Sequence, residues 1–178
     1  VVHRLDRPVS GVMLFARTSK AAMRLSEQLR NREIQKTYWA VVKNKPLLEE
    51  TLLQHYLIKN ETLNKSFAYD TEKRNTKPAL LQYKLIAALD HYFLLEVNPS
   101  TGRHHQIRVQ LAKIGCPIKG DLKYGFERSN PDNSIHLHAR KITFMHPVQK
   151  ETVSIVADPP VGDMIWRACL SATEIKKA

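Results

Sequence analysis

The sequence has little cysteine and no long apolar run. Its 178 residues include two cysteines, Cys116 and Cys169, which lie far apart and lack the spacing of metal ligands. We therefore expect both to be small core residues of a reduced, cytoplasmic protein. The sequence contains no run of eighteen apolar residues, the length that would be needed to span a membrane. The first residues lack the charged and apolar regions of a secretory signal.

Glycine-based motifs for phosphate binding or nucleophilic serine are absent as well. The chain has six glycines, and none belongs to the Gly-rich loop of a P-loop or dinucleotide-binding protein. Ser10 is followed by Gly11 but lacks the pair of flanking glycines of a hydrolase nucleophile elbow. These absences argue against the common nucleotide-dependent enzymes and serine hydrolases.

Acidic residues are clearly outnumbered. Twenty-eight Lys and Arg against seventeen Asp and Glu give a formal net charge of +11. This excess favours a polyanionic partner, most simply nucleic acid, although a solubility surface or an organism-wide basic bias would give the same count. With 43% hydrophobic residues, positions 1–178 are predicted to form one domain, and nothing in the sequence demands more than a monomer.

An acidic residue stands between basic residues within the first ten positions. The segment His3-Arg4-Leu5-Asp6 precedes Arg7 and a turn over residues 8–11. In an extended chain, side chains two apart share a face, so Arg4 and Asp6 would project together. A nearby guanidinium favours the ionised carboxylate, and an anionic Asp can act as a nucleophile. Taken alone, the pattern also fits a surface ion pair before a turn.

Hydrophobic periodicity predicts a mixed α+β domain dominated by antiparallel strands, with a few helices. The first strand is expected to be buried and to hold the Asp6 loop. The predicted strands are 12–16, 34–42, 52–58, 66–69, 80–88, 92–98, 135–144 and 152–156. The predicted helices are 18–31, a helix that follows Gly102 and runs through Lys113, and 162–176.

A second dense group of polar and basic residues, Thr101 to Arg108, is predicted to open the middle helix. Free backbone N–H groups and the positive end of the dipole at a helix start favour a phosphate. Arg103 could pair with such a phosphate, and His105 and Arg108 would lie near one edge of the helix. A basic helix start could equally be a solvated face.

Eight histidines raise the question of a metal site. His136 and His138 share a strand face and could supply two ligands, but no third ligand lies at a recognisable spacing. We therefore expect no metal, and a metal-dependent hydrolase is the less favoured of two alternative functions. The histidines are better explained as hydrogen-bonded structural groups or RNA contacts.

Taken together, the motifs resemble those of the RluA-type RNA pseudouridine synthases. His3-Arg4-Leu5-Asp6 with Ser10-Gly11 is similar to the catalytic motif of that family, and residues 102–109 resemble its second signature. The resemblance covers nearly the whole chain, because further motifs follow in the family's order. These are Lys36-Thr37-Tyr38, Lys77-Pro78-Ala79, Gly120-Asp121-x-x-Tyr124-Gly125 and Leu137-His138-Ala139.

The resemblance implies a fold and a reaction. The fold would be a mostly antiparallel sheet with flanking helices and a central cleft for RNA. The reaction would be the isomerisation of a uridine in structured tRNA or rRNA to pseudouridine, without a cofactor or a metal. The main alternative is a non-catalytic RNA-binding module on the same scaffold.

The resemblance also implies roles for individual residues. Asp6 would be the nucleophile, attacking either the ribose C1′ or the base C6 of an everted uridine. Arg108 matches the arginine that forms a salt bridge with this carboxylate. Tyr38, which spacing alone would place in the core, matches the tyrosine that stacks on uracil and takes part in transfer of the C5 proton. Arg4 matches a residue that fills the space vacated in the RNA. The other residues expected to bind RNA are Arg103, His105 and Gln106.

The sequence departs from the family pattern at a few positions. Val9 stands where the family often has Thr, and His104 where Thr or Ser is common. Relatives normally carry a Lys-Pro-bearing strand region upstream of the catalytic motif, so we expect the catalytic domain to be N-terminally incomplete. An S4-like RNA-binding module, present in some relatives, is not visible.

Overall fold

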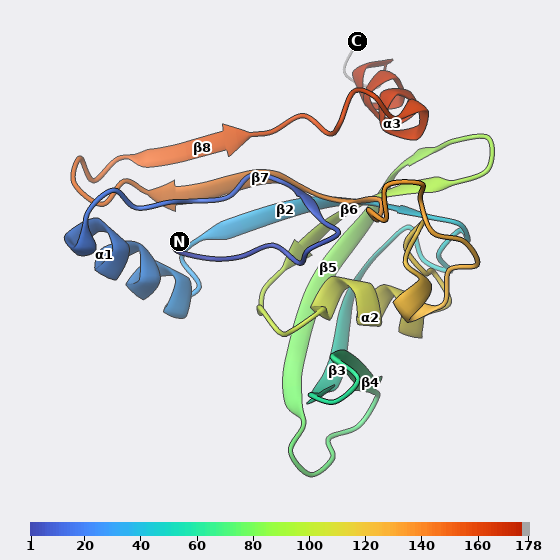
Figure 1. The fold of residues 1–178 in the computed structure, drawn as a ribbon, viewed down its shortest axis with the longest axis horizontal. Coiled ribbons are helices and arrows are strands. Elements are labelled where there is room, and N and C mark those ends of the chain that lie inside the picture. Colours follow the sequence, from blue (N-terminus) through green and yellow to red (C-terminus); the bar gives the residue numbers. More distant parts are fainter. Residues whose placement is uncertain (176–178) are drawn as a thin grey trace.

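A single eight-stranded sheet runs through the computed structural model, which describes residues 1–175 (Figure 1). The strand order is β1-β7-β2-β6-β5-β3-β4, and β8 also pairs with β7. Every pair is antiparallel except the short parallel pair β1–β7. The predicted α+β class is therefore confirmed. The strands are β1 Ser10–Gly11, β2 Gln35–Val42, β3 Glu50–Asn60, β4 Lys65–Tyr69, β5 Lys77–Ala88, β6 Phe93–Pro99, β7 Leu137–Met145 and β8 Thr152–Val156.

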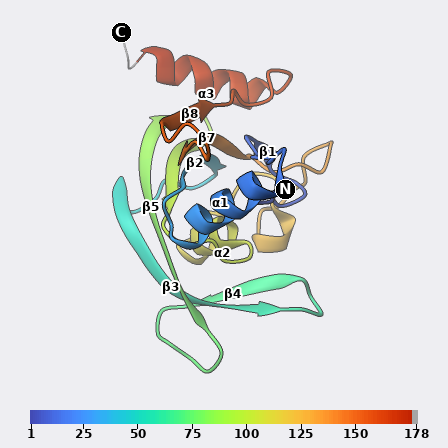
Figure 2. The ribbon, with the colours of Figure 1, turned by 90° about the vertical axis from the view of Figure 1, so that its left-hand side faces the viewer.

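Helices cover both faces of the sheet (Figure 2). The alternation of β2 shows this, because Ala40 packs with Leu111 of α2 while Trp39 packs with Trp166 of α3. Within residues 1–175 no helix has the length and apolar character needed to cross a membrane. The helices are α1 Ser19–Arg30, α2 Gln106–Lys113, the 3-10 helix η1 Leu122–Tyr124 and α3 Met164–Ile175.

The first helix follows its sequence signals closely. The Thr18 hydroxyl accepts a hydrogen bond from the Ala21 N–H at 3.2 Å, which is the geometry of an N-cap, and Asn31 ends the helix. Leu25 lies in a core cluster with Phe144 of β7, so α1 lies over the end of the sheet that β7 forms. The predicted helix 18–31 is confirmed. The predicted end of the last helix, Lys176, falls outside the described residues.

The predicted buried strand 12–16 is wrong. The first strand is only Ser10–Gly11, and Phe15 is 63% exposed. The reason is competition for the edge of β7, because β8 occupies that edge from Lys141 onward. The other predicted strands differ from the observed bounds by three residues or fewer.

The middle helix also begins later than predicted. It starts at Gln106, because His105 adopts the left-handed conformation (φ 53°) and so cannot form part of a right-handed helix. Arg103 and His104 therefore lie in the loop before α2 and not in its first turn. The side chains of this loop form part of the candidate active site.

Candidate active site

A basic cleft of about 1480 Å³ opens on the sheet face that α1 and α2 flank. Its walls come from residues 3–9, the end of α1, the start of β2 and the loop that leads into α2. All seven predicted site residues line it. Among the described residues that line the cleft, Asp6 is the one carboxylate. The basic lining residues are Arg4, Arg7, Arg30, Arg32, Lys36, Lys59, Arg103, Arg108 and Lys123.

The loop that carries Asp6 is anchored to β7 directly after the turn. Gly11 has φ +121°, and a Cβ at this position would lie 2.4 Å from the Ala139 carbonyl oxygen, so only glycine allows the close approach. The Ser10 hydroxyl lies 2.8 Å from Nδ1 of His138, its register partner on β7. These contacts position the segment before the turn, where Asp6 is 31% exposed to the cleft.

Arg108 is shared between two carboxylates. Its Nε and Nη2 donate to the two carboxylate oxygens of Asp121 at 2.7 and 2.8 Å, while Nη1 lies 3.4 Å from Oδ2 of Asp6. Burial alone would lower the pKa of Arg108, but its hydrogen bonds and charge interactions with Asp121, and then with Asp6, raise it. Asp121 thus fixes the guanidinium with its Nη1 amino group facing Asp6. The predicted Asp6–Arg108 proximity is present.

His105 brings a ring nitrogen close to Asp6. Its Nδ1 lies 2.9 Å from the Tyr124 hydroxyl, which itself accepts from the Ser66 N–H. The other ring nitrogen, Nε2, lies 3.8 Å from Oδ2 of Asp6. Burial, followed by the Arg108 charge, lowers the pKa of His105 to about 3. The ring is consequently neutral, and its contact with Asp6 is not an ion pair.

Gln106 organises the loop that precedes α2. Its Oε1 accepts from the Thr101 hydroxyl at 2.8 Å and from the Arg103 N–H at 2.9 Å, while Nε2 donates to the Leu80 carbonyl. Arg103 also donates from Nε to the Pro78 carbonyl. This use of the amide favours a positioning role for Gln106, and direct contact with RNA stays a prediction for both residues.

Tyr38 and Arg4 complete the predicted set. Tyr38 is half-buried beside a bulge in the β2–β7 pair, a feature that often re-aims side chains near active sites. Burial, together with the charge of Asp6, raises the pKa of Tyr38 to about 12. Its hydroxyl is therefore protonated near neutral pH. Arg4 is exposed at the cleft.

Sequence reasoning missed the role of Asp121. It is 1% exposed and forms the tightest contact of the site, yet the sequence assigned it no function. Its motif, with Tyr124 three residues later, was an available signal. The Arg108 guanidinium also lies 5.1 Å from the Tyr124 ring centroid, so this one motif supports the arginine from two sides.

The two histidines weighed as metal ligands are engaged by protein groups. His136 lies 3.0 Å from the Asn130 amide nitrogen and 3.1 Å from the Asp163 carboxylate. His138 contacts Ser10, and its Nε2 lies 2.9 Å from the Ala157 carbonyl oxygen. In residues 1–175, no group of three His, Cys, Asp or Glu side chains is arranged to hold a metal ion.

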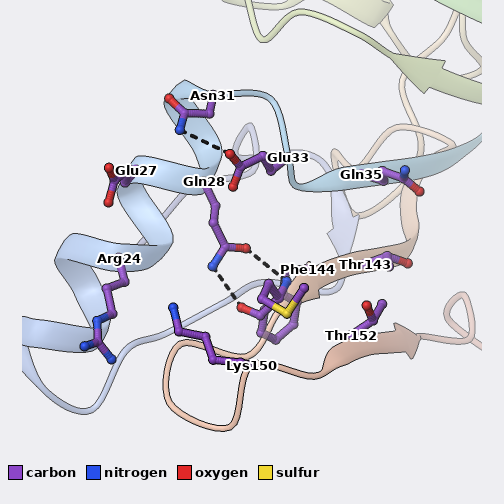
Figure 3. A pocket seen from close by; sticks show the side chains of 11 residues that line it. Arg24, Glu27, Gln28, Asn31, Glu33, Gln35, Thr143, Phe144, Lys150 and Thr152 are labelled. Carbon is purple, nitrogen blue, oxygen red and sulfur yellow. Dashed lines mark hydrogen bonds between the residues drawn. The ribbon is translucent and has the colours of Figure 1, made fainter.

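A second, smaller hollow of about 470 Å³ lies between α1 and strands β2, β7 and β8 (Figure 3). It contains two cations, Arg24 and Lys150, and two carboxylates, Glu27 and Glu33. Gln28 spans its floor, donating to the Met145 carbonyl and accepting from the Met145 N–H, both at 2.9 Å. We refer to it below as the small pocket.

The comparison with protein families agrees with this geometry. The family model described as RNA pseudouridylate synthase matches residues 1–113. The chain therefore belongs to the RNA pseudouridylate synthase family. The predicted RluA-type resemblance is confirmed, and with it the enzyme class of an RNA pseudouridine synthase, an isomerase.

Individual relatives extend the match along the chain. The chain is 31% identical to tRNA pseudouridine synthase C of Vibrio cholerae, over 96% of this chain and 75% of that protein. It is 33% identical to ribosomal large subunit pseudouridine synthase C of Rickettsia bellii, over 90% of this chain and 54% of that protein. Among solved structures, human RNA pseudouridylate synthase domain containing 4 matches with a TM-score of 0.76 and 25% identity, covering 97% of this chain and 75% of that one.

Proposed function

We propose that this protein isomerises a uridine within tRNA or rRNA to pseudouridine, with Asp6 as the nucleophile on an everted nucleotide. The observation that supports this proposal most strongly is that the partly exposed carboxylate of Asp6 faces Arg108 in a cleft with nine Lys and Arg side chains. The names of the Vibrio and Rickettsia relatives support tRNA or rRNA as the substrate class. We further propose that the enzyme acts in the cytoplasm, as a monomer and without a cofactor.

The isomerisation conserves atoms and electrons without any added reactant. Attack by the Asp6 carboxylate takes place at C1′ or at C6. By either route the N1–C1′ bond breaks, a C5–C1′ bond forms, the C5 proton leaves and N1 gains a proton. Substrate and product contain the same atoms in the same oxidation state, so the reaction consumes no group donor and no redox equivalent.

The neighbours of Asp6 have distinct tasks in this scheme. Arg108 stabilises the anionic carboxylate before attack and after its release, since its guanidinium is held in place by Asp121. Because the Tyr38 phenol is protonated near neutral pH, it accepts the C5 proton only by passing on its own. Arg4, exposed at the rim, fills the position that the everted nucleotide leaves.

Eversion has an energetic cost that the cleft can offset. Unstacking a nucleotide costs on the order of a few kcal/mol. Contacts between basic side chains and RNA phosphates release counterions and supply favourable free energy. Nine Lys and Arg side chains line the cleft and can supply such contacts.

The direct test is tritium release from RNA. The protein is incubated with tRNA or rRNA transcripts labelled as [5-³H]uridine, and the solvent and the nucleoside digest are both analysed. We expect release of tritium to water together with an equal yield of pseudouridine. RNA binding without release would contradict the proposal and would instead indicate a non-catalytic RNA-binding module.

A further inference from the structure

Lys36 has no partner in the cleft. It lies on β2, two residues before Tyr38, so the two side chains share the face that lines the cleft. It is half-buried, yet its ammonium group makes neither an ion pair nor a hydrogen bond with any residue in positions 1–175. Burial lowers the pKa of Lys36, and no carboxylate opposes this effect.

A second donor without a partner among the described residues belongs to the same cleft. His3 is 9% exposed, and its Nε2 accepts from the Leu14 N–H at 3.3 Å. The ring proton must then lie on Nδ1, which is buried without a hydrogen-bond partner among the described residues. Burial, followed by the nearby Lys36 charge, lowers the pKa of His3 to about 4, so the ring is neutral.

Both groups are donors, and the free protein offers them no acceptor. A buried N–H group without an acceptor, such as that of His3, is unfavourable and calls for an explanation. The Lys36 ammonium is open to the cleft and has no protein acceptor there. Asp6, the carboxylate of the cleft, faces Arg108 and His105 and does not pair with Lys36. An anionic ligand that enters the cleft would supply the acceptor that Lys36 lacks.

We propose that Lys36 is the charged contact of a phosphate subsite that binds an RNA backbone phosphate next to the everted nucleotide. His3 lines the same cleft and, as a neutral ring, brings no second charge to the subsite. The inference rests on the proposed function and adds to it the group that holds the backbone while the base leaves the stack.

The test measures how tRNA binding depends on salt. Each phosphate contact that is lost reduces the slope of log K against log[salt] by about one. We expect Lys36→Met to reduce the slope by this amount and Lys36→Arg, which keeps the charge, to retain it. Lys20→Met is the matched control, because Lys20 is an exposed lysine of α1 that does not line the cleft; its slope should equal that of the wild type.

Thermal unfolding gives an independent readout. Removing an unpaired, half-buried charge should raise the Tm of free Lys36→Met, whereas a structural role for the ammonium group predicts a lower Tm. An unchanged salt slope in Lys36→Met, with wild-type tritium release intact, would refute the subsite but not the proposed function. A wild-type protein that neither binds tRNA nor releases tritium would refute both. Weaker binding with an unchanged slope would place the contact on a base and also refute the subsite.

Discussion

The basic cleft and the small pocket are both polar hollows, but their charges are arranged differently. The cleft contains nine Lys and Arg side chains and one carboxylate. The small pocket balances two cations with two carboxylates, and its central amide is bonded to the backbone (Figure 3). Gln35 lines both, so the two electrostatic environments meet at one side chain. Uncompensated charge, and not a hollow as such, therefore distinguishes a site suited to RNA.

The largest effect among the supporting residues is expected at Arg108. Arg108→Lys cannot reproduce a planar group that bridges Asp121 and Asp6, so turnover should fall by about 10²–10³-fold. The affinity for tRNA should change much less, because the side chain is 5% exposed. Single-turnover tritium release and filter binding measure the two quantities. Arg24→Lys in the small pocket serves as control, and equal losses in the two variants would refute the assigned role.

A second expected difference concerns acid stability, because histidines line the cleft and none lines the small pocket. The pKa values of His3 and His105 are lowered to about 4 and about 3, mainly by burial. In the unfolded chain both titrate near 6.5, so below that pH the unfolded state binds more protons. The contribution of these two histidines to the free energy of unfolding is therefore full well above pH 6.5. It is lost as the pH falls through 6.5 toward the folded pKa values.

Thermal unfolding as a function of pH checks this sign. We expect Tm to drop by at least about 5 °C between about pH 7.5 and pH 5.5. His3→Gln removes one of the two groups and should reduce the drop. A Tm that stays level or rises over this range would show that the buried rings are already protonated in the folded protein.

The smallest effect is expected from charge reversal at the two hollows. Arg32 lines the cleft and Lys150 the small pocket, and both have positive φ, 61° and 59°, so their substitutions share a similar backbone context. Arg32→Glu should weaken tRNA binding by about tenfold at moderate salt, and Lys150→Glu by less than about twofold. Equal losses would mean that net charge alone, and not its location, governs binding.

Local signals in the sequence predicted much of the fold. The Thr18 cap predicted the start of α1, and a high content of β-branched and aromatic residues predicted β2. The strand expected over 12–16 failed because β8, distant in sequence, occupies the edge that it would need. The late start of α2 depends on a left-handed His105, which side-chain periodicity does not encode.

The candidate site was predictable as a set of residues but not as an arrangement. Recognising the motifs named Asp6, Tyr38 and Arg108, and the structure brings all three into one cleft. The sequence did not predict the bidentate salt bridge between Arg108 and Asp121. It also did not predict that Lys36 would lack a partner. Both depend on burial and on partners that only the folded chain brings together, so a sequence pattern cannot distinguish them from solvated charges.

The most direct test of Asp6 as the nucleophile compares two variants. In each, a carboxylate is replaced by its amide, one in the basic cleft and one in the small pocket. Asp6→Asn and Glu33→Gln are assayed for tritium release from [5-³H]uridine-labelled tRNA and rRNA, with RNA binding measured in parallel. Loss of a nucleophile predicts that Asp6→Asn lowers turnover by about 10⁴-fold or more while still binding RNA, and that Glu33→Gln matches the wild type. Wild-type turnover by Asp6→Asn would contradict the account.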